Sequence, residues 1–416
     1  MGEDTVYDVC VIGAGMVGSA AAKWLCKLQR ETQICLVGPQ EPTEGEWQSE
    51  KREIFSSHYD EGRLTREIDE SPIWGILARR SIQRYRQIEK ESGINFYHEV
   101  GCVHAYGENC ARFLKTVQNV QQMGHIYYQS LNAAGLRAQF PYLHAEESWQ
   151  ILYNFKNAGY VRARKFVAAQ QKIAAAHGCD VINDVVIRLQ KDVREGRRKD
   201  SLVKIVCESG RDVKAKRVLL CTGAFSNSYD LLPKDKQIEF FPIEVSVVKA
   251  ELKEEDALKM ADMPGILSRI QGKECYILPP MKYPNGKYYI KIGGYNTDFN
   301  VLGSHQEIVN WFRSQAQYED DTNEAIDLLK HMVKGLHPVS VITSSCVSSH
   351  TPTKLFYCDM ITPHVGALMG MSGQGAKSSD EIGRMGAKMI AKGSWDYDLP
   401  AGLFSLKYKK AENAKL

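Results

Sequence analysis

The sequence predicts an α/β fold that begins with a parallel β-strand, a glycine turn and a helix. Residues 6–12 form a short apolar run rich in β-branched residues, which is typical of a strand buried in a parallel sheet. The run leads directly into the glycine-rich segment 13–18, and residues 19–28 have the composition of a helix. With 416 residues the chain is too long for one ordinary compact core, so we expect two domains or one domain with a large insertion.

The charge and composition of the chain argue against several classes of protein. Lys and Arg total 53 against 50 Asp and Glu, without a basic stripe, so no nucleic-acid partner is expected. No stretch approaches the roughly 18 apolar residues of a membrane helix, so no membrane span is expected. Eleven cysteines without a secretory signal favour a reducing compartment with free thiols, and we assign no metal site.

The three glycines of the turn each have a physical role. Gly13 permits a tight turn, Gly15 lets the backbone approach a pyrophosphate, and Gly18 lets the helix pack closely on the strand. The phosphates would lie at the N-terminus of the helix, where free N–H groups point outward. Strand, turn and helix together therefore predict a Rossmann-type dinucleotide site.

The expected ribose contact departs from this pattern. The next strand is predicted at 32–37, and an acidic residue should follow it to bind the ribose hydroxyls. Gly38 stands at that position. Glu41 could reach back to the ribose, or backbone groups and water could replace the carboxylate.

Five segments of the chain are more informative together than alone: the glycine fingerprint, Thr222-Gly223-Ala224, Lys291-Ile-Gly, Cys346 and the run from Ser372 to Lys377. Alone, the turn at Thr222 could equally be a plain strand end. In their order and spacing, the five segments resemble the monomeric sarcosine oxidase and pipecolate oxidase branch of the FAD-dependent amine oxidases. The match covers nearly the whole chain, and it implies FAD as the cofactor.

The same resemblance implies the domain organisation. In that family a discontinuous Rossmann-type FAD-binding domain is interleaved with a substrate domain built on a large, mostly antiparallel sheet. We therefore assign residues 1–95, 155–235 and 345–416 to the FAD-binding domain, and residues 96–154 and 236–344 to the substrate-binding domain. The chain should thus combine an α/β domain with an α+β domain.

The stretch from Ser57 to Arg66 contains two arginines three residues apart. In the family that it resembles, the first arginine stands over the flavin and the second binds the substrate carboxylate, roles that carry over to Arg63 and Arg66. The planar fork of a guanidinium matches a carboxylate, which suits a site that orients an amino acid. A solvated helix start in a charged loop is the alternative. Tyr59 stands where the family has a second histidine.

Lys291 follows a strand-like segment, and the resemblance implies a place above the flavin, where the lysine assists oxygen. A fixed positive charge there would stabilise superoxide. A lone lysine in a strand would ordinarily lie on the surface. Tyr276 resembles a tyrosine that lines the substrate pocket, and Tyr295 stands in place of a histidine, although either could be a buried structural residue.

Cys346 occupies the place of the cysteine that, in the family, carries FAD through a thioether to the 8α-methyl group of the flavin. Most of the other cysteines are expected to be inert and buried. Two residues further on, Ser348 replaces a pocket tyrosine of sarcosine oxidase. Together with Tyr59 and Tyr295, this replacement predicts a pocket that differs from a sarcosine pocket.

A glycine-rich turn that contains Gly373 and Gly375 precedes an amphipathic helix over 380–390. Free N–H groups and the positive end of the helix dipole would face the flavin there and stabilise its anionic reduced form. In the family the lysine of this motif pairs with the substrate carboxylate, and that role carries over to Lys377. A phosphate-binding loop is a poor alternative, because the lysine follows the last glycine too soon.

The resemblance implies an oxidase of a secondary amine, or of an N-substituted or cyclic amino acid, that gives an imine and hydrogen peroxide. Arg66 and Lys377 would hold the carboxylate, Arg63 and Lys291 would be the positive groups at the flavin, and no side-chain base is assigned. The alternatives are a flavin dehydrogenase that passes electrons to a carrier, a non-catalytic FAD-binding protein and a nicotinamide enzyme. The identity of the amine stays open.

The last three residues, Ala414-Lys415-Leu416, differ from the peroxisomal address Ser-Lys-Leu by one replacement of a small residue. The preceding residues are polar, so the tail should be exposed to an import receptor. We therefore expect a peroxisomal protein, and this address suits an enzyme that makes peroxide. A frayed polar tail that carries no signal is the alternative.

Overall fold

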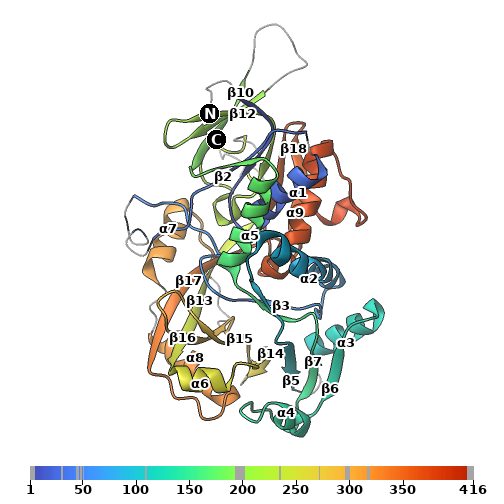
Figure 1. The fold of residues 1–416 in the computed structure, drawn as a ribbon, viewed down its shortest axis with the longest axis vertical. Helices are drawn as coiled ribbons and strands as arrows, with labels where there is room; N and C mark the ends of the chain where they lie inside the picture. The colour runs from blue at the N-terminus through green and yellow to red at the C-terminus, as the bar shows by residue number, and fades with distance from the viewer. Residues whose placement is uncertain are drawn as a thin grey trace, which may run out of the picture.

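The fold, obtained as a computed structural model, is described for residues 5–29, 31–43, 46, 49, 51–107, 110–192, 202–233, 236–270, 272–295, 300–315 and 319–409. Two lobes are stacked along the long axis of the molecule (Figure 1). Each lobe is built on a sheet of which eight strands lie in the described part of the chain. The C-terminal tripeptide lies outside the described residues.

The sheet of the first lobe has a parallel centre. Its strands are β1 (Val6–Ile12), β2 (Ile34–Val37), β9 (Cys179–Ile182), β10 (Val186–Asp192), β11 (Leu202–Cys207), β12 (Asp212–Leu220), β18 (Tyr357–Thr362) and β19 (Val365–Met369). The parallel strands lie in the order β9-β2-β1-β12-β19, while β18 joins β19 and β11 joins β12 in the antiparallel sense. Strand β2 is wholly buried, as expected for a parallel strand covered on both faces.

Four long helices pack together in this lobe: α1 (Met16–Leu28), α2 (Pro72–Ser92), α5 (Ala163–Ala176) and α9 (Gly375–Lys392) (Figure 1). Helices α1 and α9 cross closely at Gly383. A β-carbon placed on this glycine would lie 2.6 Å from Cβ of Ala20. A buried ion pair between Lys23 of α1 and Asp380 of α9 adds a second link between the two helices.

The sheet of the second lobe is mostly antiparallel. Its strands are β5 (Cys102–Tyr106), β6 (Tyr128–Leu131), β7 (Gln150–Asn154), β13 (Phe241–Leu252), β14 (Gly265–Ile270), β15 (Lys273–Lys282), β16 (Tyr288–Gly293) and β17 (Ser340–His350). They lie in the order β17-β13-β16-β15-β14-β5-β7-β6, and the β5–β14 pair is parallel. Helices α4 (Ala133–Gln139), α6 (Glu254–Lys259) and α8 (Glu319–Met332) contribute apolar side chains to the core on one face of this sheet.

The remaining elements complete the second lobe and the junction. Helix α7 (His305–Ser314) packs on β17, and α3 (Ala111–Met123) lies between β5 and β6 in the chain. A small sheet of β3 (Arg63–Thr65), β8 (Gly159–Val161) and β4 (Tyr97–His98) lies near the middle of the molecule (Figure 1). The predicted domain boundary at residue 345 falls inside β17.

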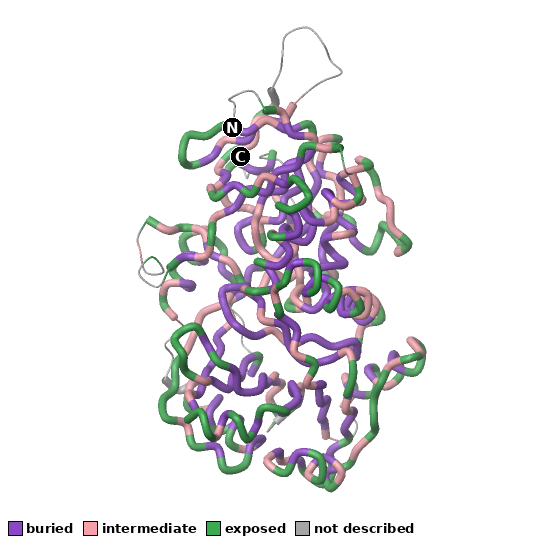
Figure 2. Tube along the Cα trace, in the orientation of Figure 1, coloured by how far each residue is buried: buried purple, intermediate pink, exposed green. Residues whose placement is uncertain are grey.

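The predicted fold class is confirmed. A Rossmann-type α/β lobe is interleaved along the chain with a lobe built on a large, mostly antiparallel sheet. Figure 2 shows that buried residues gather in the first sheet, in its helices and in the middle of the molecule. Within the described ranges, no helix has the length and apolar character needed to cross a bilayer.

Candidate active site

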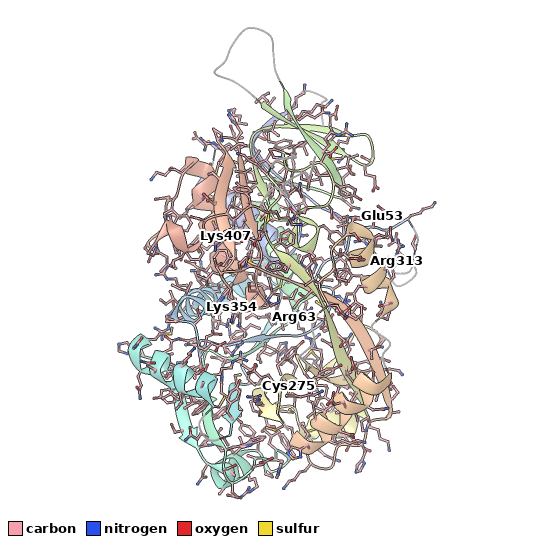
Figure 3. The ribbon with its side chains drawn as sticks, turned by 180° about the vertical axis from the view of Figure 1, so that it is seen from behind. Glu53, Arg63, Cys275, Arg313, Lys354 and Lys407 are labelled. Carbon is pink, nitrogen blue, oxygen red and sulfur yellow. The ribbon has the colours of Figure 1, made fainter. Side chains whose placement is uncertain are left out.

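A cavity of about 530 Å³ lies where the two lobes meet. Its walls come from the turns after β1, β2 and β12, from the N-termini of α1 and α9, and from β13, β14, β15 and β17. Figure 3 places Arg63 near the middle of the molecule and Cys275 of β15 in the second lobe, and both line the cavity. A ligand held by the first lobe would therefore meet a ligand held by the second.

The glycine turn after β1 is packed too tightly for side chains. Gly13 has φ +109°, and a β-carbon on it would lie 2.3 Å from the carbonyl oxygen of Cys221. A β-carbon on Gly18 would lie 1.8 Å from the carbonyl oxygen of Gly13. Gly15 caps α1 with extended backbone, and no side chain caps this helix N-terminus among the described residues. The first N–H groups of α1 are thus available to a phosphate.

Close packing explains why a glycine stands at position 38, and the sequence alone did not reveal this packing. A β-carbon on Gly38 would lie 2.5 Å from the backbone nitrogen of Ala14, inside the glycine turn. An acidic side chain cannot occupy this position without moving the turn. Glu41 does not line the cavity, and its Oε1 lies 2.5 Å from Nε of Arg164. Its carboxylate therefore has a partner away from the cavity wall.

Two further turns border the cavity. Thr222 and Gly223 follow β12, and Gly223 has φ +56° in the left-handed region. Gly373 has φ +72°, and Gly375 is the first residue of α9. In the described part of the chain, no side chain caps the N-terminus of α9, so this second helix also offers free N–H groups to the cavity.

Asp60 is the centre of a buried cluster of charges. Its Oδ2 lies 2.5 Å from Nζ of Lys291 and 2.5 Å from Nη1 of Arg63. Its Oδ1 accepts a hydrogen bond from the hydroxyl of Tyr283 at 3.0 Å and lies 3.8 Å from Nζ of Lys249. Asp60 and Arg63 line the cavity, whereas Lys291 and Lys249 lie behind the lining residues. Lys291, the lysine predicted to lie at the flavin, therefore contacts the cavity wall through Asp60.

The pKa values of Asp60 and Lys291 are both lowered in this cluster, but for different reasons. Burial alone would raise the pKa of Asp60, but the charges of Lys291, Lys249 and Arg63 hold it well below its usual range. Burial lowers the pKa of Lys291 to about 8, although Asp60 opposes this shift. Three cations against one carboxylate leave the cluster with net positive charge.

A second charged cluster also borders the cavity. Arg66 and Lys377 line the wall, and Asp69 stands behind them. Oδ2 of Asp69 accepts a short hydrogen bond from Nζ of Lys377 and lies 3.3 Å from Nη2 of Arg66. Nε of Arg66 is buried and has no hydrogen-bond partner among the described residues. Two predicted carboxylate-binding residues thus stand side by side.

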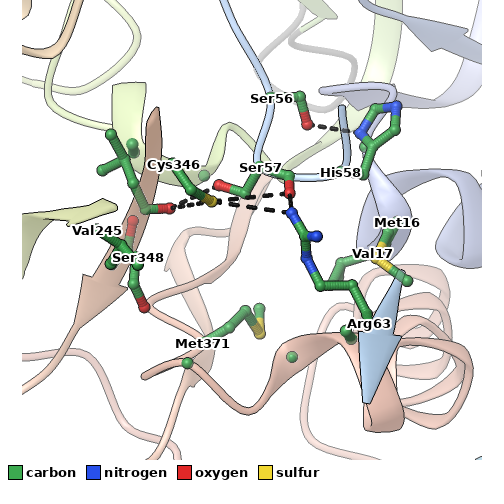
Figure 4. Close-up of a pocket in the computed structure, with 18 of the residues that line it drawn as sticks. Met16, Val17, Ser56, Ser57, His58, Arg63, Val245, Cys346, Ser348 and Met371 are labelled. Carbon is green, nitrogen blue, oxygen red and sulfur yellow. Dashed lines mark hydrogen bonds between the residues drawn. The ribbon is translucent and has the colours of Figure 1, made fainter. Parts of the chain in front are cut away.

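Cys346 lies on β17, beside Arg63. Figure 4 shows the Arg63 guanidinium pointing toward Ser57 and Cys346, with Sγ of Cys346 3.9 Å from Nη2 of Arg63. The eleven cysteines, all within the described residues, are free thiols. Cys221 and Cys275 also line the cavity but are buried, whereas Cys346 is partly exposed to it. This accessibility distinguishes Cys346 among the cysteines at the wall.

The predicted pocket residues do not all reach the cavity. Tyr59, Tyr276 and Ser348 line it. Burial raises the pKa of Tyr276 above its usual value, so this phenol stays protonated. Tyr295 does not line the cavity, because its ring packs in the core of the second lobe and its hydroxyl lies 3.3 Å from Oγ of Ser246. The assignment of Tyr295 to the pocket wall is therefore corrected.

Sequence reasoning missed the counterions Asp60 and Asp69 and the buried Lys249. It also missed a pair at the cavity wall, where Arg112 of α3 forms an ion pair with Glu274 of β15. Asp69 follows Arg66 by three residues, a spacing typical of ion pairs, so the sequence did hold a signal for it. The sequence held no such signal for Lys249, because the role of this lysine depends on the register between β13 and neighbouring strands.

The residues at the wall fit FAD. A dinucleotide needs a close backbone approach, and the packed glycines of the first turn provide it. The uncapped N-termini of α1 and α9 offer N–H groups at two separate places along the same cavity. A positive cluster and a partly exposed thiol lie between the lobes. Among the described residues, no group of His, Cys, Asp or Glu is arranged to hold a metal ion.

The fold and this cavity define a dinucleotide-binding protein whose cofactor site continues into a site walled by buried cations. The chain belongs to the FAD dependent oxidoreductase family, whose sequence profile matches residues 8–389. The flavin cofactor and the oxidoreductase class that the sequence predicted are confirmed by this match.

Similar proteins include two groups of oxidases. Monomeric sarcosine oxidase from Bacillus sp. (strain NS-129) is 23% identical over 407 residues, which cover 97% of this chain and 97% of that protein. N-methyl-L-tryptophan oxidase from Yersinia pestis (strain Pestoides F) is 21% identical and covers 92% of this chain and 94% of its own. Among solved structures, NikD, an amino acid oxidase of nikkomycin biosynthesis, has a TM-score of 0.73 at 16% identity, covering 97% of this chain and 98% of its own.

Proposed function

We propose that the protein is an oxidase that uses FAD and oxygen to oxidise a secondary amine, or an N-substituted or cyclic amino acid. The observation that carries the proposal is the adjacent pair Arg66 and Lys377, two buried cations at the cavity wall where a substrate carboxylate can bind. Oxidation of sarcosine and of N-methyl-L-tryptophan by similar proteins supports it. The CH–NH group loses two electrons and two protons to become an imine, and oxygen gains them as hydrogen peroxide.

The residues of this chain supply binding, orientation and charge, and bound FAD supplies the two-electron acceptor chemistry. Arg66 and Lys377 hold the substrate carboxylate, which fixes the amine between the lobes. The net positive field of Arg63, Lys291 and Lys249 disfavours an ammonium ion, so the amine binds in its neutral form. A neutral amine needs no side-chain base, and none is assigned.

The same positive field suits the reaction with oxygen. Arg63 lies at the wall, Lys291 stands behind Asp60, and both are fixed by hydrogen bonds to the carbonyl oxygen of Gly62, at 2.8 Å and 2.6 Å. Fixed cations stabilise negative charge that develops on oxygen without having to reorganise. We assign Arg63 and Lys291 to this step.

We further propose that Cys346 carries FAD covalently. Its thiol is partly exposed at the cavity wall, and the Arg63 guanidinium lies beside it. The buried thiols of Cys221 and Cys275 at the same wall lack this exposure. Of the other predicted cofactor contacts, Gly18 and Glu41 do not line the cavity. Those that lie along it are Gly13, Gly15, Thr222, Gly223, Gly373 and Gly375.

A panel of amines tests the proposed activity. The purified protein is mixed anaerobically with sarcosine, larger N-methyl amino acids and cyclic imino acids, and bleaching of the flavin absorbance is recorded. Oxygen is then admitted and peroxide is measured. We expect a larger secondary amino acid to be preferred over sarcosine, because Tyr59 and Ser348 replace family residues at the wall. Bleaching without peroxide would support a dehydrogenase, and no bleaching with any amine would support a non-catalytic FAD protein.

We also propose peroxisomal import through Ala414-Lys415-Leu416. A fluorescent protein fused to the N-terminus should colocalise with a peroxisomal marker, and removal of the last three residues should leave it diffuse. Equal distribution of both forms would reject the signal.

A further inference from the structure

We infer that Asp69 is the fixed counterion of the carboxylate site formed by Arg66 and Lys377. Asp69 leaves this site with one net positive charge, so the site selects substrates with a single free carboxylate. This inference rests on the proposed function and deepens it. Asp69 does not line the cavity, so it acts through Arg66 and Lys377 as a positioning residue.

The geometry fixes Asp69 between the two cations. One oxygen, Oδ2, bonds Nζ of Lys377 and lies 3.3 Å from Nη2 of Arg66. The other oxygen, Oδ1, accepts a hydrogen bond from the backbone N–H of Ser71 at 3.0 Å, just before α2. The backbone oxygen of Asp69 accepts another from Nδ2 of Asn119 at 2.7 Å. All three charged side chains of the cluster are buried. Asp69 is thus held by hydrogen bonds from Ser71 and Asn119, independently of any ligand.

The charges of the cluster leave room for one substrate carboxylate. Two cations and one carboxylate carry one net positive charge, and Nε of Arg66 has no partner in the described part of the chain. A monocarboxylate would neutralise the cluster. The next cation along the wall, Arg112, already pairs with Glu274 and lies 3.5 Å from Oε1 of Glu70. A second carboxylate on the substrate would therefore find no uncompensated cation at this cluster or at Arg112. An amine without a carboxylate would leave the buried cluster charged.

Asp69 also keeps Lys377 protonated. Burial and the nearby charge of Arg66 lower the pKa of Lys377 to about 8, and Asp69 opposes them. Arg112 is a further cation that lowers this pKa. His104 and Cys102, two further titratable groups near Lys377, are neutral, since burial holds the pKa of His104 well below its usual range and raises that of Cys102 to about 12.

The sign of the pH effect follows from these charges. Removing the negative charge of Asp69 lowers the pKa of Lys377 further, so Lys377 loses its proton at a lower pH. Carboxylate binding that needs the protonated lysine then weakens at a lower pH in the variant than in the wild type. The direction of this shift does not depend on how tightly the variant binds when Lys377 is protonated.

The test uses Asp69→Asn, which removes the charge and keeps the shape, in the holoenzyme. Acetate, a carboxylate without an amine, is titrated by calorimetry between pH 6 and pH 9. We expect the ratio of the variant Kd to the wild-type Kd to rise about tenfold or more between pH 6 and pH 8, since one pKa unit corresponds to a tenfold change. A ratio that stays constant across this range would overturn the inference.

The neighbouring acid Glu70 provides a matched control. It approaches Arg112 but is not hydrogen-bonded to Lys377 or Arg66, so Glu70→Gln should leave the Kd ratio constant within about twofold. Asp69→Glu retains the charge and should restore part of the wild-type pH profile. If Asp69→Asn does not fold, Asp69→Glu decides the question. A pH profile of the acetate Kd like that of the wild type supports the role of the charge. Binding that weakens at a lower pH than in the wild type contradicts it.

The choice of substrate is tested on the wild-type enzyme. An N-methyl amino acid is compared with its primary amide and with an N-methyl dicarboxylic amino acid. We expect KM for the amide and for the dicarboxylate to exceed KM for the monocarboxylate about tenfold or more. Equal KM values would overturn the inference while leaving the proposed oxidase intact. Conversely, the predicted acetate profile in a protein that no amine reduces would sustain the Asp69 role and reject the oxidase.

Discussion

Lys291 and Arg63 donate to the same oxygen of Asp60, each at 2.5 Å, although they come from strands of different sheets. The shared carboxylate fixes the two cations relative to each other across the junction of the lobes. Removal of either cation would leave the other bound to Asp60. The two can therefore be tested separately.

The charge of Lys291 should matter for oxygen and not for the amine. Lys291→Met deletes the charge and keeps a similar volume, and Asp60 retains Arg63 and Lys249 as partners. Loss of a preorganised charge costs on the order of 3–4 kcal/mol, so reoxidation of the reduced enzyme should slow by about a hundredfold or more. Anaerobic reduction by substrate should change much less. Stopped-flow absorbance measures both half-reactions.

Lys249→Met is the control for this experiment. Lys249 lies 3.8 Å from Asp60 and bonds Oγ of Ser344 at 2.7 Å, so its loss perturbs the cluster less directly. We expect a smaller effect on reoxidation. Equal losses in both half-reactions of Lys291→Met, or a loss in reduction alone, would move Lys291 into substrate binding or structure.

FAD should remain attached to the wild-type protein after precipitation in acid and should be released from Cys346→Ser. The reason is the partly exposed thiol of Cys346 at the cavity wall. Absorbance of the pellet and of the supernatant decides the outcome. Cys275→Ser, at the same wall but buried, should retain its flavin. Flavin that washes out of the wild type would leave Cys346 as an ordinary thiol.

Arg66→Ala should raise KM for a carboxylate-bearing substrate by about thirtyfold or more, because truncating one partner of a buried charged contact costs roughly 2–5 kcal/mol. The rate at saturating substrate should fall less, since Lys377 still contacts the carboxylate. Steady-state peroxide release gives both constants. Arg112→Ala serves as a control at the same cavity wall. Its partner Glu274 is half exposed, and a change in KM below about tenfold is expected. Unchanged KM would remove Arg66 from the site.

Gly38→Ala should weaken FAD binding, because the new β-carbon would lie 2.5 Å from the backbone of Ala14 in the phosphate turn. Overpacking of this kind costs about 1–3 kcal/mol. Thermal unfolding and the flavin content after expression report the loss. Gly107→Ala adds a β-carbon with nothing within 4 Å and should behave as the wild type. Equal flavin content in the two variants would show that the turn can move.

The sequence predicts most of the first lobe because its signals are local. The glycines at 13, 15 and 18 lie next to the strand and helix that they join, so short-range sterics determine their roles. The same locality applies to the run that ends at Lys377. The counterions behave differently, since Asp60 and Lys291 are 231 residues apart in the chain. No spacing rule links two such positions, and only the packed fold brings them together.

Tyr295 shows why a side chain can leave the face that its neighbours predict. Residues 291, 293 and 295 would share one face of a regular strand, because side chains alternate. Gly294, however, has φ +75°, which interrupts the alternation after the end of β16. Tyr295 consequently packs in the same core as Ile290 and Ile292. The expectation that Tyr295 lines the pocket is therefore wrong, and the alternative of a buried structural tyrosine describes this residue.

The crossing of α1 and α9 at Gly383 and Ala20 has a thermodynamic consequence. Gly383 of α9 packs directly on Ala20 of α1, and the Lys23–Asp380 pair joins the two helices again, so neither can shift alone. Their N-termini border different parts of one cavity. We therefore expect cooperative binding of the two halves of the cofactor: an adenine nucleotide without the flavin ring, held at α1, should slow amide hydrogen exchange in α9 as well.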